Sequence, residues 1–88
     1  MANCKLVTYD LDKPGQNYNA VISAIKNYKW AKVCESAWIV QTEDSCVTVR
    51  DHIQQSMDTN DRIFVTGLSG EAAWNNVICS SDWLKENL

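Results

Sequence analysis

The fold of this chain is decided early, by the stretch Lys5-Leu6-Val7-Thr8-Tyr9-Asp10-Leu11-Asp12-Lys13-Pro14-Gly15. A run rich in β-branched and aromatic residues ends on a carboxylate, and a Pro-Gly breaker follows at once, which is typical of a strand end. We therefore predict a strand over residues 4–10 and a loop over residues 11–16. The strand places Asp10 where the sheet meets the loop. A carboxylate there can bind a metal ion or shape the turn.

The rest of the chain supplies two amphipathic helices and three further strands. Apolar residues recur at helical spacing over residues 17–28, where Asn17 could cap the start, and over residues 45–57. Residues 30–41 are β-prone but exceed a usual strand length, so we divide them into two strands near Glu35-Ser36. A polar turn then leads into a final strand over residues 62–67.

The element order β-α-β-β-α-β predicts a ferredoxin-like α+β fold, in which a four-stranded antiparallel sheet carries both helices on one face. The length of 88 residues fits a single domain, with a core over residues 4–67 and a C-terminal tail over residues 68–88. The second sheet face would be open, and an open apolar face needs a cover.

The tail is the candidate for that cover. Trp74, Val77 and Ile78 recur at helical spacing, and Ser81-Asp82 before Trp83-Leu84 indicates a short capped helix. Two tryptophans can bury a large apolar area. We expect Trp74 and Trp83 to pack on their own sheet or on a second copy rather than to stack on nucleic-acid bases.

Composition limits the partners. The formal net charge is -3, which disfavours a duplex-DNA binder because such proteins neutralise phosphates with basic residues. The sequence has no apolar leader and no run of about 18 apolar residues, so we expect a cytoplasmic protein without a membrane partner. The cysteines make no C-x-x-C pair, and we expect buried reduced thiols rather than zinc ligands at Cys4, Cys34, Cys46 and Cys79.

Several segments resemble a known family, the small CRISPR-associated nuclease-fold subunit of the Cas-two family, and resemble still more closely its SinR-like relatives. The resemblance rests on Val7-Thr8-Tyr9-Asp10-Leu11, Pro14-Gly15-Gln16-Asn17-Tyr18, Glu35-Ser36-Ala37-Trp38-Ile39-Val40 and Asp58-Thr59-Asn60-Asp61-Arg62-Ile63-Phe64-Val65. It covers about residues 4–67. It implies a ferredoxin-like fold and a symmetric homodimer. Some members cut RNA or DNA with a divalent metal ion, which the aspartate at the end of the first strand holds between the two copies. Asp10 occupies that position here. Other members of the family are structural or binding proteins.

Asp10 is accordingly the candidate catalytic residue, and Asp10 and Asp12 are the candidate ligands of Mg²⁺ or Mn²⁺. Hard cations take oxygen ligands and often only one or two protein carboxylates. A metal so placed could activate water and offset charge on a phosphate. The alternative is structural, with either carboxylate bonding loop amides in an Asx-turn.

Four further residues are candidates for contact with nucleic acid or a nucleotide: Ser36, Lys26, Lys29 and Lys32. Ser36 could meet a phosphate or bond the local backbone. The lysines are the basic cluster of the sequence, and they could contact single-stranded nucleic acid or form an ordinary solvated surface. Their spacing crosses a helix end, so they need not share a face. The single histidine, His52, is expected on the surface, without a partner at ligand spacing.

Two classes of function follow. The first is a metal-dependent phosphodiesterase or endoribonuclease that acts on RNA or a small nucleotide as a homodimer, with Asp10 as metal ligand. The second is a non-catalytic dimeric protein that sequesters a nucleotide signal or inhibits a protein partner, as a phage-type counter-defence protein would. A structural subunit of a larger assembly is a third interpretation.

Overall fold

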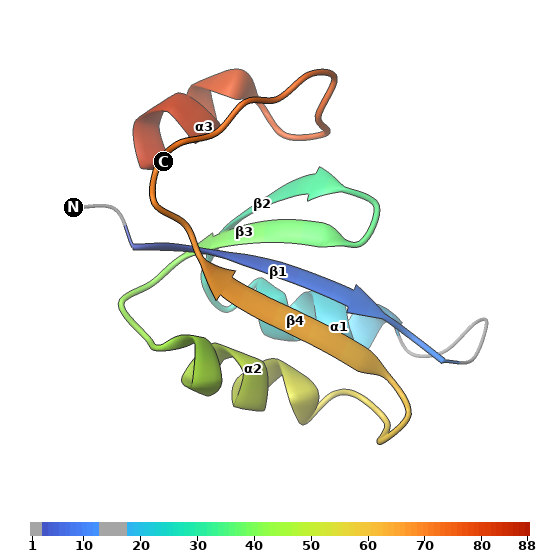
Figure 1. Cartoon of the computed structure of the whole chain (residues 1–88). Coiled ribbons are helices and arrows are strands. Elements are labelled where there is room, and N and C mark those ends of the chain that lie inside the picture. Colours follow the sequence, from blue (N-terminus) through green and yellow to red (C-terminus); the bar gives the residue numbers. More distant parts are fainter. Residues whose placement is uncertain (1–2, 13–17) are drawn as a thin grey trace.

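The structure, a computed structural model, describes residues 3–12 and 18–88. Its strands are β1 (Cys4–Asp10), β2 (Lys29–Cys34), β3 (Ala37–Gln41) and β4 (Arg62–Gly67), and its helices are α1 (Tyr18–Ile25), α2 (Cys46–Gln54) and α3 (Ser81–Asn87). The strands form one antiparallel sheet in the order β2-β3-β1-β4 (Figure 1). This order and the βαββαβ succession confirm the predicted ferredoxin-like fold, to which a C-terminal helix is added.

Helices α1 and α2 lie side by side on one face of the sheet (Figure 1). The apolar residues of alternate strand positions face them, and the buried cluster between the layers contains Val7, Tyr9, Leu11, Val21, Ala24, Ile25, Trp38, Val40, Val49 and Ile53. Period-2 alternation in the strands and 3.6-residue spacing in the helices bring these side chains to one layer. Within the described residues, no helix is long and apolar enough to cross a membrane.

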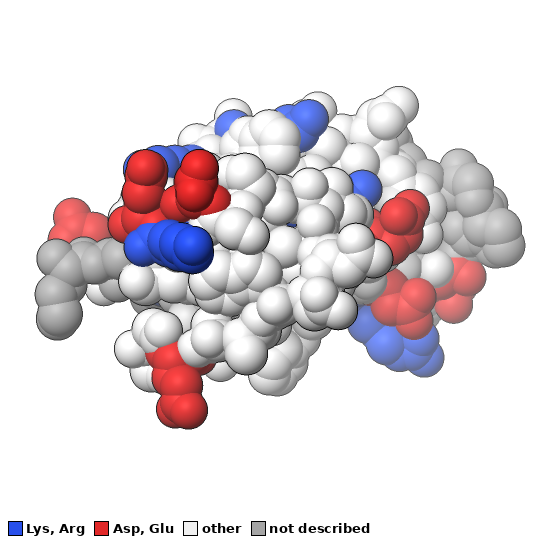
Figure 2. Space-filling view, turned by 90° about the horizontal axis from the view of Figure 1, so that it is seen from above, with Lys and Arg blue, Asp and Glu red and all other residues white. Residues whose placement is uncertain are grey.

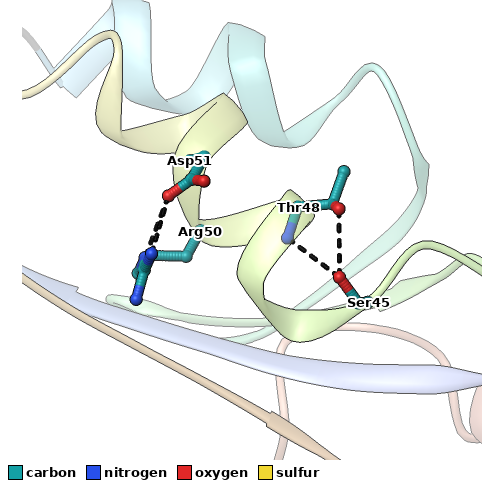
Figure 3. Close-up of polar contacts among 4 residues, drawn as sticks. All are labelled: Ser45, Thr48, Arg50 and Asp51. Atoms are coloured by element: carbon teal, nitrogen blue, oxygen red, sulfur yellow. Dashed lines mark hydrogen bonds and ion pairs between the residues drawn. The ribbon is translucent and has the colours of Figure 1, made fainter.

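Both helices are shorter than predicted. Helix α1 ends at Ile25 rather than at residue 28. The amides of Asn27 and Tyr28 bond to carbonyls only three residues back, with the Tyr28 N–H donating to the Ile25 carbonyl at 3.1 Å. Its proposed cap, Asn17, lies outside the described residues. Helix α2 begins after Ser45, whose Oγ accepts from the Thr48 N–H at 3.1 Å (Figure 3). It ends at Gln54, short of residue 57.

The long β-prone stretch divides where the sequence indicated. Glu35 and Ser36 form the turn between β2 and β3, and the pairing register shifts between Lys32 and Cys34. Such a bulge places an extra residue in one strand and increases its local twist. The hairpin therefore carries Ser36 to the same end of the sheet as the end of β1, where the Ser36 carbonyl accepts from the Tyr9 N–H at 3.3 Å.

The tail covers the second face of the sheet, as predicted, but with less helix than the spacing suggested. Helix α3 lies across the sheet from α1 and α2 (Figure 1). Trp74 and Val77 pack in an irregular segment, and Ile78 is 60% exposed. Asn76 has a φ of 58°, and this left-handed conformation breaks a helix at that point. The short helix begins after Ser80, whose Oγ accepts from the Trp83 N–H.

Polar contacts fix the tail at several points. The Leu68 N–H donates to the Cys4 carbonyl at 3.0 Å, and the Ile78 N–H donates to the Val33 carbonyl at 3.1 Å. The buried Asn87 side chain donates to the Trp83 carbonyl at 2.8 Å, and its backbone carbonyl accepts from the Cys4 thiol at 3.1 Å. Trp74 and Trp83 pack against the cluster around Cys4 and Leu84, on the chain's own sheet.

The cysteines differ more than the sequence suggested. Cys4 is buried and Cys46 and Cys79 are partly exposed, whereas Cys34 is exposed at the bulged end of β2, so its predicted burial is wrong. Burial raises the pKa of the Cys4 thiol, and the nearby Lys5 and Lys29 ammonium groups offset part of that rise.

We expect a thiol reagent to label Cys34 of the native protein quickly and Cys4 only on the timescale of unfolding. Reaction requires an accessible thiolate, and Cys4 lacks both access and an ordinary pKa. Mass spectrometry of peptides after timed labelling would measure this order. Equal labelling rates at the two positions would contradict the burial of Cys4.

Candidate functional site

Asp10 stands where the sequence placed it, at the exposed end of β1. Its cross-strand neighbour in β4 is Arg62, and Nη1 of Arg62 lies 3.1 Å from Oδ2 of Asp10. The pair borders a shallow hollow of about 170 Å³ beside Thr8 and Phe64. Phe64 is 62% exposed, so this end of the sheet remains uncovered by the tail. An exposed ion pair of this kind contributes about 1 kcal/mol or less.

The donor set for a metal is incomplete within one copy. Among residues 3–12 and 18–88, no three His, Cys, Asp or Glu side chains gather as a metal-binding group. The Asp12 N–H donates to the Asp61 carboxylate at 2.7 Å, and the Asp58 N–H donates to the same carboxylate at 2.8 Å. Asp61 therefore ties the loop after β1 to the turn before β4. Sequence reasoning assigned it no role, although an aspartate in a polar turn is a common acceptor for loop amides.

The three candidate lysines separate onto two faces. Lys26 Nζ lies 4.7 Å from the centre of the Trp30 ring, and Lys32 Nζ lies 5.5 Å from that of Trp38. The two indoles contact each other with ring centres 5.4 Å apart. Lys29 is on the opposite face, near Cys4, because strand residues alternate. We call the first four residues, Lys26, Trp30, Trp38 and Lys32, the cation–indole ladder.

A hollow of about 220 Å³ adjoins the Lys32 end of the ladder. It lies between the start of α1 and the β2–β3 turn, and it brings Ser36 and Lys32 together with two aromatic residues and one carboxylate. The full lining is Tyr9, Tyr18, Ile22, Lys32, Glu35 and Ser36. No local pattern singled out Tyr18 or Glu35 as site residues, because they meet Lys32 only through the packing of α1 on the hairpin.

The inner wall of this hollow is rigid. Trp38 Nε1 donates to the Tyr9 hydroxyl at 3.3 Å, in the buried core. Burial raises the pKa of the Tyr9 phenol, and the bond from Trp38 offsets part of that rise. The Tyr9 and Tyr18 rings are in contact, with centres 6.3 Å apart. The hollow thus has two tyrosine side chains in its walls, together with the Ser36 hydroxyl, one ammonium and one carboxylate.

His52 is more enclosed than predicted. Its Nε2 lies 3.2 Å from Asn27 Nδ2 and 3.3 Å from the carbonyl oxygen of Ala24, and its ring meets Tyr28 edge to face. The histidine therefore joins α2 to the end of α1. Its contacts are structural, since they fill the seam between the two helices.

Comparisons with known proteins support the fold. No family model matches the chain. A solved structure described as a hypothetical protein TT1823 from Thermus thermophilus is similar, with a TM-score of 0.69 and 15% sequence identity. The match covers 88% of this chain and 94% of the other. At this level of identity the likeness establishes the shared ferredoxin-like arrangement, and function has to be argued from the site.

Proposed function

We propose that this protein binds a phosphate-bearing ligand, single-stranded RNA or a nucleotide, along the accessible members of the cation–indole ladder, Lys26, Trp30 and Lys32, and in the hollow beside it. The observation that carries the proposal is the meeting of Lys32 and Ser36 with Tyr18 in one hollow. An ammonium and a hydroxyl can hold a phosphate, and an aromatic face accepts a base of any sequence. The resemblance of the sequence to the Cas-two family, some members of which cut RNA or DNA, agrees with a ligand of this class.

Glu35 favours one orientation of the ligand in the hollow. A carboxylate repels phosphate but accepts hydrogen bonds from ribose hydroxyls and from the amino groups of bases. The phosphate would therefore lie toward Lys32 and Ser36, and the sugar or base toward Glu35. Because pockets that enclose whole small ligands usually measure about 300–1,000 Å³, a hollow of 220 Å³ would take one part of the ligand, with the rest along the ladder.

We expect Lys32→Gln to weaken binding of a short oligouridine at least tenfold at low salt, since one charge-assisted hydrogen bond contributes roughly 1.5–3 kcal/mol. Quenching of tryptophan fluorescence would measure the affinity, because two indoles belong to the ladder. The dependence of affinity on salt should also become less steep.

Lys29→Gln is the matched control, because Lys29 lies three residues away on the opposite face of the same strand and should leave the affinity unchanged. Lys32→Arg should retain most of the binding. An equal loss with both glutamine variants, or a wild-type protein that binds no oligonucleotide at low salt, would refute the proposed site.

A metal-dependent phosphodiesterase remains a second candidate, favoured by the exposed carboxylate of Asp10 at the strand end. One copy supplies too few ligands, so this activity requires a homodimer that brings two Asp10 carboxylates together. The position of β4 at the sheet edge, with Phe64 exposed beside it, favours such pairing. Arg62 would have to release Asp10 before the carboxylate could bind a cation.

For this second candidate we expect Asp10→Asn to abolish Mn²⁺-dependent cleavage of single-stranded RNA while lowering the free energy of unfolding by less than about 1 kcal/mol. The substitution removes the charge that a cation needs but preserves the shape. Sedimentation of the wild-type protein should show twice the mass of 10.0 kDa. A monomer, or a dimer that never cleaves with Mn²⁺ present, would exclude the enzyme and leave the binding protein.

A further inference from the structure

A second, larger cavity lies on the other face of the sheet, beneath the tail. Its volume is about 440 Å³. The sheet supplies the floor through Leu6, Val33 and Ile39, and the tail supplies the roof through Trp74, Val77 and Leu84. The ladder lies on the helix-covered face, so this cavity is separate from the proposed nucleotide site.

Hydrogen bonds tie the tail to the sheet at two points around the cavity, and a third bond joins two parts of the tail. The backbone of Leu68 is bonded to Cys4 in β1, and the backbone of Ile78 is bonded to Val33 in β2. Between these points the Trp74 ring is fixed by its Nε1, which donates to the Ser81 Oγ at 3.2 Å. The tail is therefore tethered to the sheet on both sides of the segment that contains Trp74, and the indole bond joins that segment to the start of α3. Ala72 and Ala73 lie in that segment and line the cavity, and their small side chains leave the space open.

The lining contains no charged side chain. Its polar side chains are the Cys34 thiol and the Asn75 amide, both on exposed residues, so they belong where the cavity meets solvent. Figure 2 looks down on the tail, and it shows charged residues toward the two ends of this face with an uncharged surface between them. No side chain of the lining offers a counter-ion to a charged ligand, and desolvating an unpaired charge is costly.

From the size, the anchored walls and the uncharged lining, we infer that the space between tail and sheet is a binding site for a small neutral apolar molecule, an aromatic compound or a short alkyl chain. An apolar cavity of about 150 Å³ in a protein core already takes up benzene, and ligand pockets span about 300–1,000 Å³. The Asn75 amide at the rim provides one hydrogen bond to a polar end group.

The neutral dye N-phenyl-1-naphthylamine tests the site directly, because its emission rises on transfer to an apolar environment. We expect saturable micromolar binding to the wild-type chain. Ala73 is an exposed residue of the lining, so Ala73→Phe adds a ring at the mouth of the cavity and should weaken dye binding at least tenfold. Val47→Phe is the matched control: it adds a similar ring to the exposed side of α2, and it should leave the dye affinity unchanged.

Labelling of Cys34 gives a second measurement that needs no variant. Because Cys34 lines the same cavity, bound dye should slow its reaction with a thiol reagent severalfold, while the unfolded chain shows no such protection. Three results would overturn the inference: no saturable binding to the wild-type chain, unchanged affinity in a folded Ala73→Phe variant, or unprotected Cys34 at saturating dye. Displacement of the dye as the protein concentration rises, in step with dimer formation, would instead identify a second copy as the occupant.

Discussion

Trp38→Ala should lower the free energy of unfolding by about 3–5 kcal/mol, the usual range for truncating a large buried aromatic side chain. Trp38 is 2% exposed in the layer between sheet and helices, and its Nε1 bonds to the Tyr9 hydroxyl. The substitution leaves a cavity and deprives a buried hydroxyl of its partner. Since the total free energy of unfolding of a native protein is about 5–15 kcal/mol, this substitution should remove much of the stability. Urea unfolding followed by far-ultraviolet circular dichroism would measure the change.

Trp30→Ala is the natural control for this variant. Trp30 contacts the Trp38 ring from the adjacent strand but is 38% exposed. Its truncation should therefore lower the free energy of unfolding by well under half the loss expected for Trp38→Ala. The comparison separates burial from residue type, because the two indoles touch and belong to the same ladder. Similar losses at both positions would show that the Trp38 side of the core is more accessible than the structure indicates.

Leu84→Ala should be the second most damaging single substitution in this comparison, with a loss of about 2–5 kcal/mol. Leu84 is 2% exposed and packs with Cys4 and Ile39 on the second face of the sheet. If the tail unfolds together with the sheet, the midpoint of global urea unfolding should fall by the corresponding amount. The slope of the transition should remain unchanged.

Ile78→Ala serves as the control within the same tail, because Ile78 is 60% exposed and should lose less than about 0.5 kcal/mol. Comparing the two variants tests whether the tail unfolds in the same cooperative transition as the sheet. A folded Leu84→Ala protein with an unchanged unfolding midpoint would mean that the tail detaches separately. The cavity beneath it would then have no fixed roof, and the inferred apolar site would fail with it.

The two faces of the sheet have different chemical characters. The face under α1 and α2 has a cationic and aromatic margin at β2, formed by the ladder and the adjoining hollow. The opposite face carries an uncharged cavity under the tail. Binding of a polar ligand and of an apolar ligand can thus be tested separately, since Lys32→Gln and Ala73→Phe act on opposite faces.

The sequence by itself determined the order of the elements and the side chains that face the helices. The helical spacing of apolar residues over 17–28 and 45–57 is a local property, and it predicted two amphipathic helices whose buried residues include Val21, Val49 and Ile53. Asp10 could likewise be placed at a strand end, because a Pro-Gly breaker follows it within a few residues. These predictions agree with the structure because each depends on the chemistry of a short segment.

Tertiary structure alone decided which polar groups meet. Arg62 pairs with Asp10 because β4 is the neighbour of β1 in the sheet, and that pairing is set by the packing of both helices on one face. Lys32 meets Ser36 and Tyr18 for the same reason, whereas Lys29 is turned away by strand alternation. The spacing of Trp74 and Val77 predicted a helix. The segment is instead irregular, because its side chains pack on the sheet and Asn76 adopts a left-handed conformation. Contacts between residues distant in sequence depend on how the elements pack, and no local pattern encodes them.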